Sequence, residues 1–179
     1  MTDDDLGDVV RTGHFIYESG HHGDTWLDLD ALIARPARLA DLSRRLAERL
    51  RTVVADMVCG PLEGGAFVAH WIAHELHLRF AYASRAVTPD GPRYAVPNGF
   101  PIAGQRVILV DDAINVGSAA LATARALADR GAEVTAVAGL LLCTPQGAAV
   151  GEALEVPQAY LVEIPRTTWT PGDCPHCGT

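Results

Sequence analysis

The segment Val107–Ala119, with the sequence VILVDDAINVGSA, decides which fold we expect for this chain. Its first four residues are apolar and predict a buried strand, and Asp111 and Asp112 follow directly at the carboxyl end of that strand. Gly117 then interrupts the chain before an alanine-rich run that predicts a helix. The N–H groups at a helix start lack partners within the helix, so this turn can bind a phosphate, and the carboxylates beside it can hold sugar hydroxyls or a metal ion. An acidic turn that only caps a helix would give the same pattern, so both interpretations stay open.

The rest of the chain alternates between strand-like and helix-like segments, which predicts an α/β fold with a mainly parallel twisted sheet. We expect about five strands, with helices on both faces of the sheet. The expected strands are 56–59, 79–83, 106–110, 133–142 and 158–164, and the expected helices are 36–51, 66–78, 117–130 and 146–153. Residues 1–12 are expected to form a short acidic helix or a frayed start, and the alternation in 13–20 and 25–30 predicts a hairpin.

The length of 179 residues favours a single domain with a substantial core. We expect one domain over residues 1–179, with a core of residues 36–157. A small hood is expected beside this core, formed by residues 1–35 together with a C-terminal tail, residues 158–179. Residues 84–104 contain several glycines and prolines and show little periodicity, which predicts a long mobile loop or a weak hairpin.

Composition and charge disfavour several classes of partner. The 49% hydrophobic and 20% charged residues are typical of a globular protein, and no apolar run has the length of a membrane span. The formal net charge of −8 disfavours binding to nucleic acid or to an anionic membrane, because such a surface repels phosphates. The acidic start of the sequence lacks the order of a secretion signal, which predicts a cytoplasmic protein. All 14 lysine or arginine positions are arginine, so the chemistry cannot depend on a lysine.

The cysteines do not by themselves predict a metal site. The motif Cys174-Pro-His-Cys177 has the spacing of half a zinc site, but a structural zinc needs four ligands and the chain has no second Cys-x-x-Cys pair. Cys59 and Cys143 lie in apolar, strand-like segments. The sequence therefore favours reduced thiols without a bound metal.

The histidines fall into two groups with several interpretations each. His14, His21 and His22 are interpreted as exposed turn residues, as groups that contact a base, or as a metal cluster. His70, His74 and His77 share one face of a predicted helix, and a solvated or interface face explains them better than a metal site.

A second glycine-rich segment, Cys59–Gly65 with the sequence CGPLEGG, stands between a predicted strand and a predicted helix. Its glycines leave backbone amides exposed, and such amides can bind a diphosphate. An ordinary strand-to-helix turn would also contain these glycines, so the segment is informative only together with Val107–Ala119.

Together the two segments resemble the donor-binding signature of type I phosphoribosyltransferases, which bind phosphoribosyl pyrophosphate. The resemblance implies that Asp111 and Asp112 hold the ribose hydroxyls. It also implies that the 5-phosphate lies in a loop formed by Asn115, Val116, Gly117, Ser118 and Ala119. The leaving diphosphate would lie in a loop formed by Gly60, Pro61, Leu62, Glu63, Gly64 and Gly65. A Mg²⁺ ion would be held by the donor without direct protein ligands, and the two aspartates would reach it through water.

The N-terminal segment GHFIYESGHHGD, residues 13–24, resembles the hood of orotate phosphoribosyltransferases. This resemblance implies a homodimer that converts orotate to orotidine 5′-monophosphate, with the loop 84–99 closing over the site. The implied base-contacting residues are Phe15, Ser19, Gly20 and His22, and Arg85 is the implied catalytic residue of the loop.

The sequence also departs from that family at functional positions. Asn115 and Val116 stand where threonines are usual, and Ala86 stands where the loop ordinarily carries a lysine. An arginine expected to read the orotate ring is missing after the penultimate strand, where Cys143 and Thr144 stand instead. Two alternatives therefore stay open: a phosphoribosyltransferase for a different acceptor, and a non-catalytic regulator that binds phosphoribosyl pyrophosphate or a nucleotide.

Overall fold

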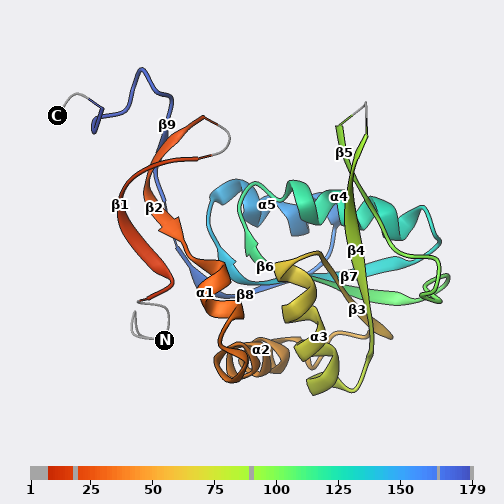
Figure 1. The fold of residues 1–179 in the computed structure, drawn as a ribbon. Coiled ribbons are helices and arrows are strands. Elements are labelled where there is room, and N and C mark those ends of the chain that lie inside the picture. The colour runs from red at the N-terminus through yellow and green to blue at the C-terminus, as the bar shows by residue number, and fades with distance from the viewer. Residues whose placement is uncertain (1–7, 18–19, 89–90, 165, 178–179) are drawn as a thin grey trace.

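The computed structural model describes residues 8–17, 20–88, 91–164 and 166–177, which form two sheets and five helices (Figure 1). The strands are β1 Val10–Ile16, β2 His22–Leu27, β3 Met57–Pro61, β4 Arg79–Thr88, β5 Gly91–Ala95, β6 Arg106–Ile114, β7 Glu133–Leu142, β8 Gln158–Glu163 and β9 Thr168–Trp169. The helices are α1 Leu29–Ile33, α2 Pro36–Leu50, α3 Gly64–Leu76, α4 Ser118–Ala128 and α5 Pro145–Leu154. No helix in these described ranges is both long enough and apolar enough to cross a membrane.

The larger sheet has six strands in the order β5-β4-β3-β6-β7-β8. The five strands from β4 to β8 in this order are parallel to their neighbours, and β5 pairs antiparallel with β4 at the edge. The predicted α/β fold with a mainly parallel sheet is therefore confirmed. Because β3 and β6 are neighbours in the centre, the segments that follow their carboxyl ends meet at the same edge of the sheet.

Two layers of helices bury both faces of this sheet, with α2 and α3 on one face and α4 and α5 on the other (Figure 1). Burial on both faces explains why Val107–Val110 of β6 is a continuous apolar run, with each residue 0% exposed. On α2, leucines at helical spacing point into the core, namely Leu39, Leu42, Leu46 and Leu50.

The smaller sheet forms the hood and has the order β1-β2-β9. β1 and β2 make the predicted hairpin, and β9 adds a strand from the far end of the chain, pairing Trp169 with His22. The C-terminal tail was predicted to belong to the hood from residue 158 onward. Residues 158–163 instead form β8 of the larger sheet, so only the part of the tail after β8 belongs to the hood.

One further prediction was wrong in part, and another had left two alternatives open. Residues 10–12 are the start of β1 and not a helix, because pairing with β2 overrides local preference, while residues 1–7 lie outside the described residues. For residues 84–104 the sequence left a mobile loop and a weak hairpin open, and the structure shows the hairpin: β4 continues to Thr88 and pairs antiparallel with β5, Gly91–Ala95.

We predict that Ile108→Ala, in the centre of β6, lowers the free energy of unfolding by about 2–5 kcal/mol, because Ile108 is 0% exposed and truncation leaves a cavity. Urea denaturation measures this change. The control is Val54→Ala, since Val54 is 62% exposed and should change stability by less than about 0.5 kcal/mol. Equal effects of the two substitutions would contradict the assignment of β6 to the core.

Candidate functional site

The two glycine-rich segments lie against each other at the carboxyl edge of the larger sheet. α3 begins at Gly64, directly after the turn that follows β3. A Cβ atom on Gly64 would overlap Asp112 Oδ2, and a Cβ atom on Gly65 would lie 2.6 Å from Asp111 Oδ1. The start of α3 and the two carboxylates are therefore in contact, and this approach requires glycine at both positions.

Burial defines the electrostatics of the carboxylate pair. Asp111 is only 8% exposed, and its Oδ1 accepts a hydrogen bond from the Asp112 N–H at 3.0 Å. Asp112 is partly buried, and its Oδ1 accepts from the Ala113 N–H at 2.8 Å. Burial, reinforced by the negative charge of Asp112, raises the pKa of Asp111 well above its usual value. Burial also raises the pKa of Asp112, so the pair favours a ligand that donates hydrogen bonds or carries positive charge.

Two of the helices that start at this edge, α3 and α4, lack a side-chain cap. Neither Glu63 before α3 nor Gly117 before α4 caps its helix with a side chain, whereas Asp28 caps α1 and Thr144 caps α5. The uncapped N–H groups at the two helix starts carry partial positive charge, which makes each start a site for an anion. The carboxylate pair Asp111–Asp112 belongs to the strand between them.

The turn before α4 has a shape that only glycine allows. Gly117 has φ of 77°, and a Cβ atom there would also overlap Val150 Cγ2 on α5. The turn is held from the other side by Thr144, whose hydroxyl donates a hydrogen bond to the Asn115 carbonyl at 2.7 Å. Val116, which stands where a hydroxyl was expected, is 58% exposed. The backbone of the predicted 5-phosphate loop is therefore in place, although its side-chain donors are fewer.

A cleft of about 710 Å³ lies beside the predicted diphosphate loop and Asp112, a size within the usual range for small-molecule sites, and residues 115–119 of the predicted 5-phosphate loop are not part of its lining. Its lining comes from the hood side, the diphosphate loop, β4 and β6, namely Leu29, Asp30, Ile33, Leu62, Glu63, Gly64, Phe67, Ser84, Arg85 and Asp112. Arg85 thus lies at the same cleft as Asp112, as its predicted role requires. The Leu62–Glu63 peptide bond at the floor of the diphosphate loop is cis.

Sequence analysis missed Arg166, which follows β8. Its guanidinium donates a hydrogen bond to Asn115 Oδ1 and lies 5.0 Å from the centre of the Tyr17 ring. Its Nε is buried and has no hydrogen-bond partner within the described part of the chain. Burial raises the pKa of the Cys143 thiol to about 11, and the positive charge of Arg166 opposes that rise. The only signal in the sequence is an isolated arginine in an otherwise uncharged stretch.

The predicted base-contacting residues of the hood are more dispersed than the residues of the two glycine-rich segments. Phe15 packs against Trp26, with ring centroids 6.0 Å apart, and Gly20 has φ of 79° in the turn between β1 and β2. His22 is buried, and its Nδ1 lies 3.0 Å from Cys177 Sγ. Ser19 lies outside the described residues.

Comparison with known proteins identifies one family model, the phosphoribosyl transferase domain, which matches residues 28–174. The orotate phosphoribosyltransferase of Caldicellulosiruptor saccharolyticus is 30% identical over 172 residues, covering 96% of this chain and 86% of the relative. The orotate phosphoribosyltransferase of Caldanaerobacter subterraneus subsp. tengcongensis is 29% identical over 171 residues, covering 95% and 86%.

Solved structures with different named bases share the fold. The Mycobacterium tuberculosis orotate phosphoribosyltransferase matches with a TM-score of 0.72 at 22% identity, over 89% of this chain and 94% of that one. The adenine phosphoribosyltransferase of Thermoanaerobacter pseudethanolicus matches with a TM-score of 0.74 at 16% identity, over 91% and 100%. The fold alone therefore does not select the base.

We predict that Asp111→Asn stabilises the protein at neutral and alkaline pH. Because the folded-state pKa of Asp111 is raised, the native state binds more protons than the unfolded state, so stability falls as pH rises through that pKa. The asparagine variant lacks this loss and should gain about 1.4 kcal/mol for each unit by which the pKa is raised.

Urea denaturation from pH 4 to pH 8 measures the difference, which should shrink toward the acidic end. Asp129→Asn, at an exposed position after α4, serves as the control and should change stability by less than about 0.5 kcal/mol at every pH. A variant less stable than the parent at pH 8 would contradict this account of Asp111.

Proposed function

The chain belongs to the phosphoribosyltransferase family, a family of pentosyltransferases, and on that premise we propose that it transfers the phosphoribosyl group of phosphoribosyl pyrophosphate to orotate. The products are orotidine 5′-monophosphate and diphosphate. The observation that carries the proposal is the pair of uncapped helix starts, α3 and α4, at the sheet edge that also holds Asp111 and Asp112, whose pKa values burial raises.

Each part of the donor has a matching group in this arrangement. The N–H groups at the start of α4 and the Ser118 hydroxyl bind the 5-phosphate, and those at the start of α3 bind the diphosphate. Asp111 and Asp112 accept hydrogen bonds from the ribose hydroxyls between the two phosphate sites. Such donors stabilise the ionised carboxylates, so donor binding lowers the raised pKa of the pair.

The carboxylate pair also fits a Mg²⁺ ion, because this hard cation prefers oxygen ligands and retains several waters. Asp111 and Asp112 would orient those waters while the donor supplies the direct ligands. When bound, the ion neutralises negative charge on the diphosphate.

We propose orotate as the acceptor because of its negative charge and the positive charge of Arg166. Orotate carries a carboxylate, whereas adenine is neutral, and Arg166 brings a guanidinium to the junction of the hood and the 5-phosphate loop. The Arg166 guanidinium carries a fixed positive charge and several N–H donors, which suit a carboxylate. The orotate phosphoribosyltransferases among the relatives support the same choice.

In the reaction, a ring nitrogen of orotate attacks C1 of the ribose and releases its proton to solvent, while the bond from C1 to the diphosphate oxygen breaks. The bonding electrons leave with the diphosphate, so positive charge near that group lowers the barrier. Arg85 lines the cleft and supplies such charge in a chain without lysine.

The β4–β5 hairpin projects beyond the sheet (Figure 1), and we propose that it covers the site in a homodimer, reaching the cleft of the partner subunit.

A diphosphate-release assay tests the proposal, with phosphoribosyl pyrophosphate, Mg²⁺ and a panel containing orotate, uracil, adenine and hypoxanthine. We expect turnover with orotate alone. The double variant Asp111→Asn with Asp112→Asn should weaken donor binding about 100-fold, because it removes two charge-assisted hydrogen bonds of at least about 1.5 kcal/mol each. Calorimetry with the donor measures that loss.

Other outcomes would replace the proposal in defined ways. Turnover with a different base would assign another acceptor to the same donor site. Donor binding without turnover over the whole panel would make the chain a regulator, and unchanged donor affinity in the double variant would refute the site.

Arg166→Gln should raise the KM for orotate about 10- to 100-fold, the loss expected for one charge-assisted bidentate contact. The KM for phosphoribosyl pyrophosphate should change little, which separates base recognition from damage to the Asn115 turn. Arg166→Lys keeps the charge without the planar fork and should give an intermediate KM for orotate. Parallel increases in both KM values would show that Arg166 supports the loop and does not read the base.

A further inference from the structure

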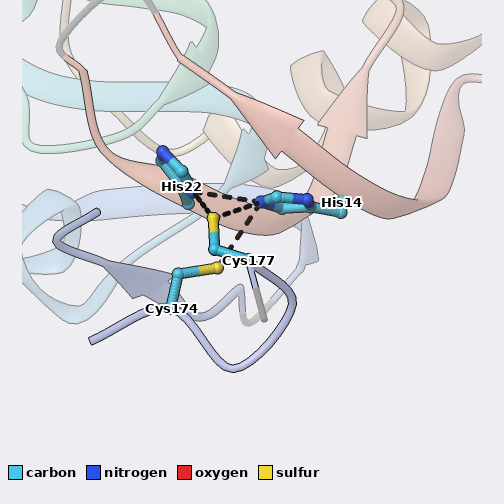
Figure 2. A group of neighbouring side chains, drawn as sticks. All are labelled: His14, His22, Cys174 and Cys177. Atoms are coloured by element: carbon cyan, nitrogen blue, oxygen red, sulfur yellow. Dashed lines mark hydrogen bonds between the residues drawn. The ribbon is translucent and has the colours of Figure 1, made fainter. Parts of the chain in front are cut away.

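Four side chains of metal-binding type converge where the hood meets the C-terminal segment: His14, His22, Cys174 and Cys177 (Figure 2). Their ligand atoms all lie within 4.8 Å of one another. His14 Nε2 lies 3.0 Å from His22 Nδ1 and 3.4 Å from Cys174 Sγ. Cys177 Sγ lies 3.8 Å from His14 Nε2 and 3.0 Å from His22 Nδ1.

Four of the six separations are close to the edges of a tetrahedron around one zinc ion, and all six are within 4.8 Å. With Zn–S bonds of about 2.3 Å and Zn–N bonds of about 2.0–2.1 Å, tetrahedral geometry places nitrogens about 3.3 Å apart, nitrogen and sulfur about 3.6 Å apart, and sulfurs about 3.8 Å apart. The observed separations of 3.0, 3.4, 3.8 and 3.0 Å scatter around these values. Small shifts of the side chains are enough to bring all of them to one ion.

Hydrogen bonds alone account poorly for the same contacts. His14 Nε2 has three heteroatoms within 3.8 Å, and His22 Nδ1 has two at 3.0 Å. An imidazole nitrogen carries either one proton or one lone pair, so it can make one good hydrogen bond and not three. Nitrogen and sulfur atoms whose lone pairs all point to a common centre are typical of a metal site.

The fold builds this convergence from segments at opposite ends of the chain. The strand register shifts between Thr12 and Phe15, a β-bulge that re-aims His14, and β2 supplies His22. β9 then fixes the tail on the hood, because Trp169 pairs with His22. A turn at 170–173, with Thr170 Oγ1 donating to Asp173 Oδ2 at 2.6 Å, returns the chain so that Cys174 and Cys177 face the two histidines.

We propose that His14, His22, Cys174 and Cys177 bind one Zn²⁺ ion as a structural site. Two thiols and two imidazoles complete a tetrahedral sphere, which leaves no open position for a catalytic water. On binding, each cysteine thiol releases its proton to solvent, and the two thiolates balance the charge of the ion. No oxidation or reduction takes place.

The site would act as a cross-link between distant parts of the sequence. His14 and Cys174 are 160 positions apart, so the ion closes nearly the whole chain into a loop and fastens the tail to the hood. The same tail carries Arg166, whose guanidinium contacts Tyr17 of the hood. This inference does not depend on the base that the protein uses.

Metal analysis of the untagged, full-length protein, purified under reducing conditions, tests the proposal. We expect one zinc per chain, and X-ray absorption should give two sulfur ligands at about 2.3 Å and two nitrogen ligands at about 2.0–2.1 Å. Removing the metal with a chelator should lower Tm, and adding Zn²⁺ at about 100 times its Kd should raise Tm again by about 5 °C or more.

Variants identify the ligands. Cys174→Ser with Cys177→Ser should lose the zinc, and His22→Ala should lower zinc affinity by at least about 10-fold. His176→Ala is the matched control, because His176 lies between the two cysteines but outside the cluster, and it should keep one zinc. If a variant does not fold, Co²⁺ added to the chelator-treated parent protein gives the answer independently, through the absorption bands of tetrahedral thiolate coordination.

Several results would overturn the site. These are a metal-free parent protein that also fails to bind added Zn²⁺ or Co²⁺, a Cys174–Cys177 disulfide under reducing conditions, and full zinc content in the double cysteine variant.

Discussion

The close approach of the start of α3 to the Asp111–Asp112 pair is the constraint on which the rest of this structure depends. Gly64 and Gly65 permit it, because any side chain there would collide with a carboxylate. The approach places the uncapped start of α3 against the two acids, and burial raises the pKa of each. Burying like charges is costly unless a ligand compensates, so the native state retains a destabilised site that fits a polyhydroxylated, phosphorylated donor.

The larger sheet supplies the rigidity that this arrangement needs. β3 and β6 are neighbours whose apolar residues are buried on both faces, so the turns that follow them are fixed relative to each other. The hood and tail differ from the larger sheet in size and in buried apolar area. They cover one side of the site with short strands and a small sheet, and little apolar burial holds β9 in place. A metal cross-link at this junction is therefore physically reasonable, because small units often need such a staple.

The larger sheet could be predicted from the sequence because each strand and helix depends on a pattern of residues close together in the chain. The apolar run Val107–Val110 and the leucines of α2 have periodicities that a buried strand and an amphipathic helix require. What sequence analysis missed depends on contacts between distant residues. A two-residue strand such as Thr168–Trp169 has no periodicity, and nothing in the sequence indicates that it pairs with His22. For the same reason Cys174 and Cys177 looked like half a site, and Arg166 was not singled out.

Hydrogen–deuterium exchange with phosphoribosyl pyrophosphate and Mg²⁺ tests the central claim most directly, because it reads the two loops at once. We expect slower exchange at the amides of Gly60–Gly65 and of Asn115–Ala119 on the same addition, with the α2 amides unchanged. Saturating donor that protects neither loop, or only one of them, would contradict a single donor site built by the contact between α3 and the Asp111–Asp112 pair.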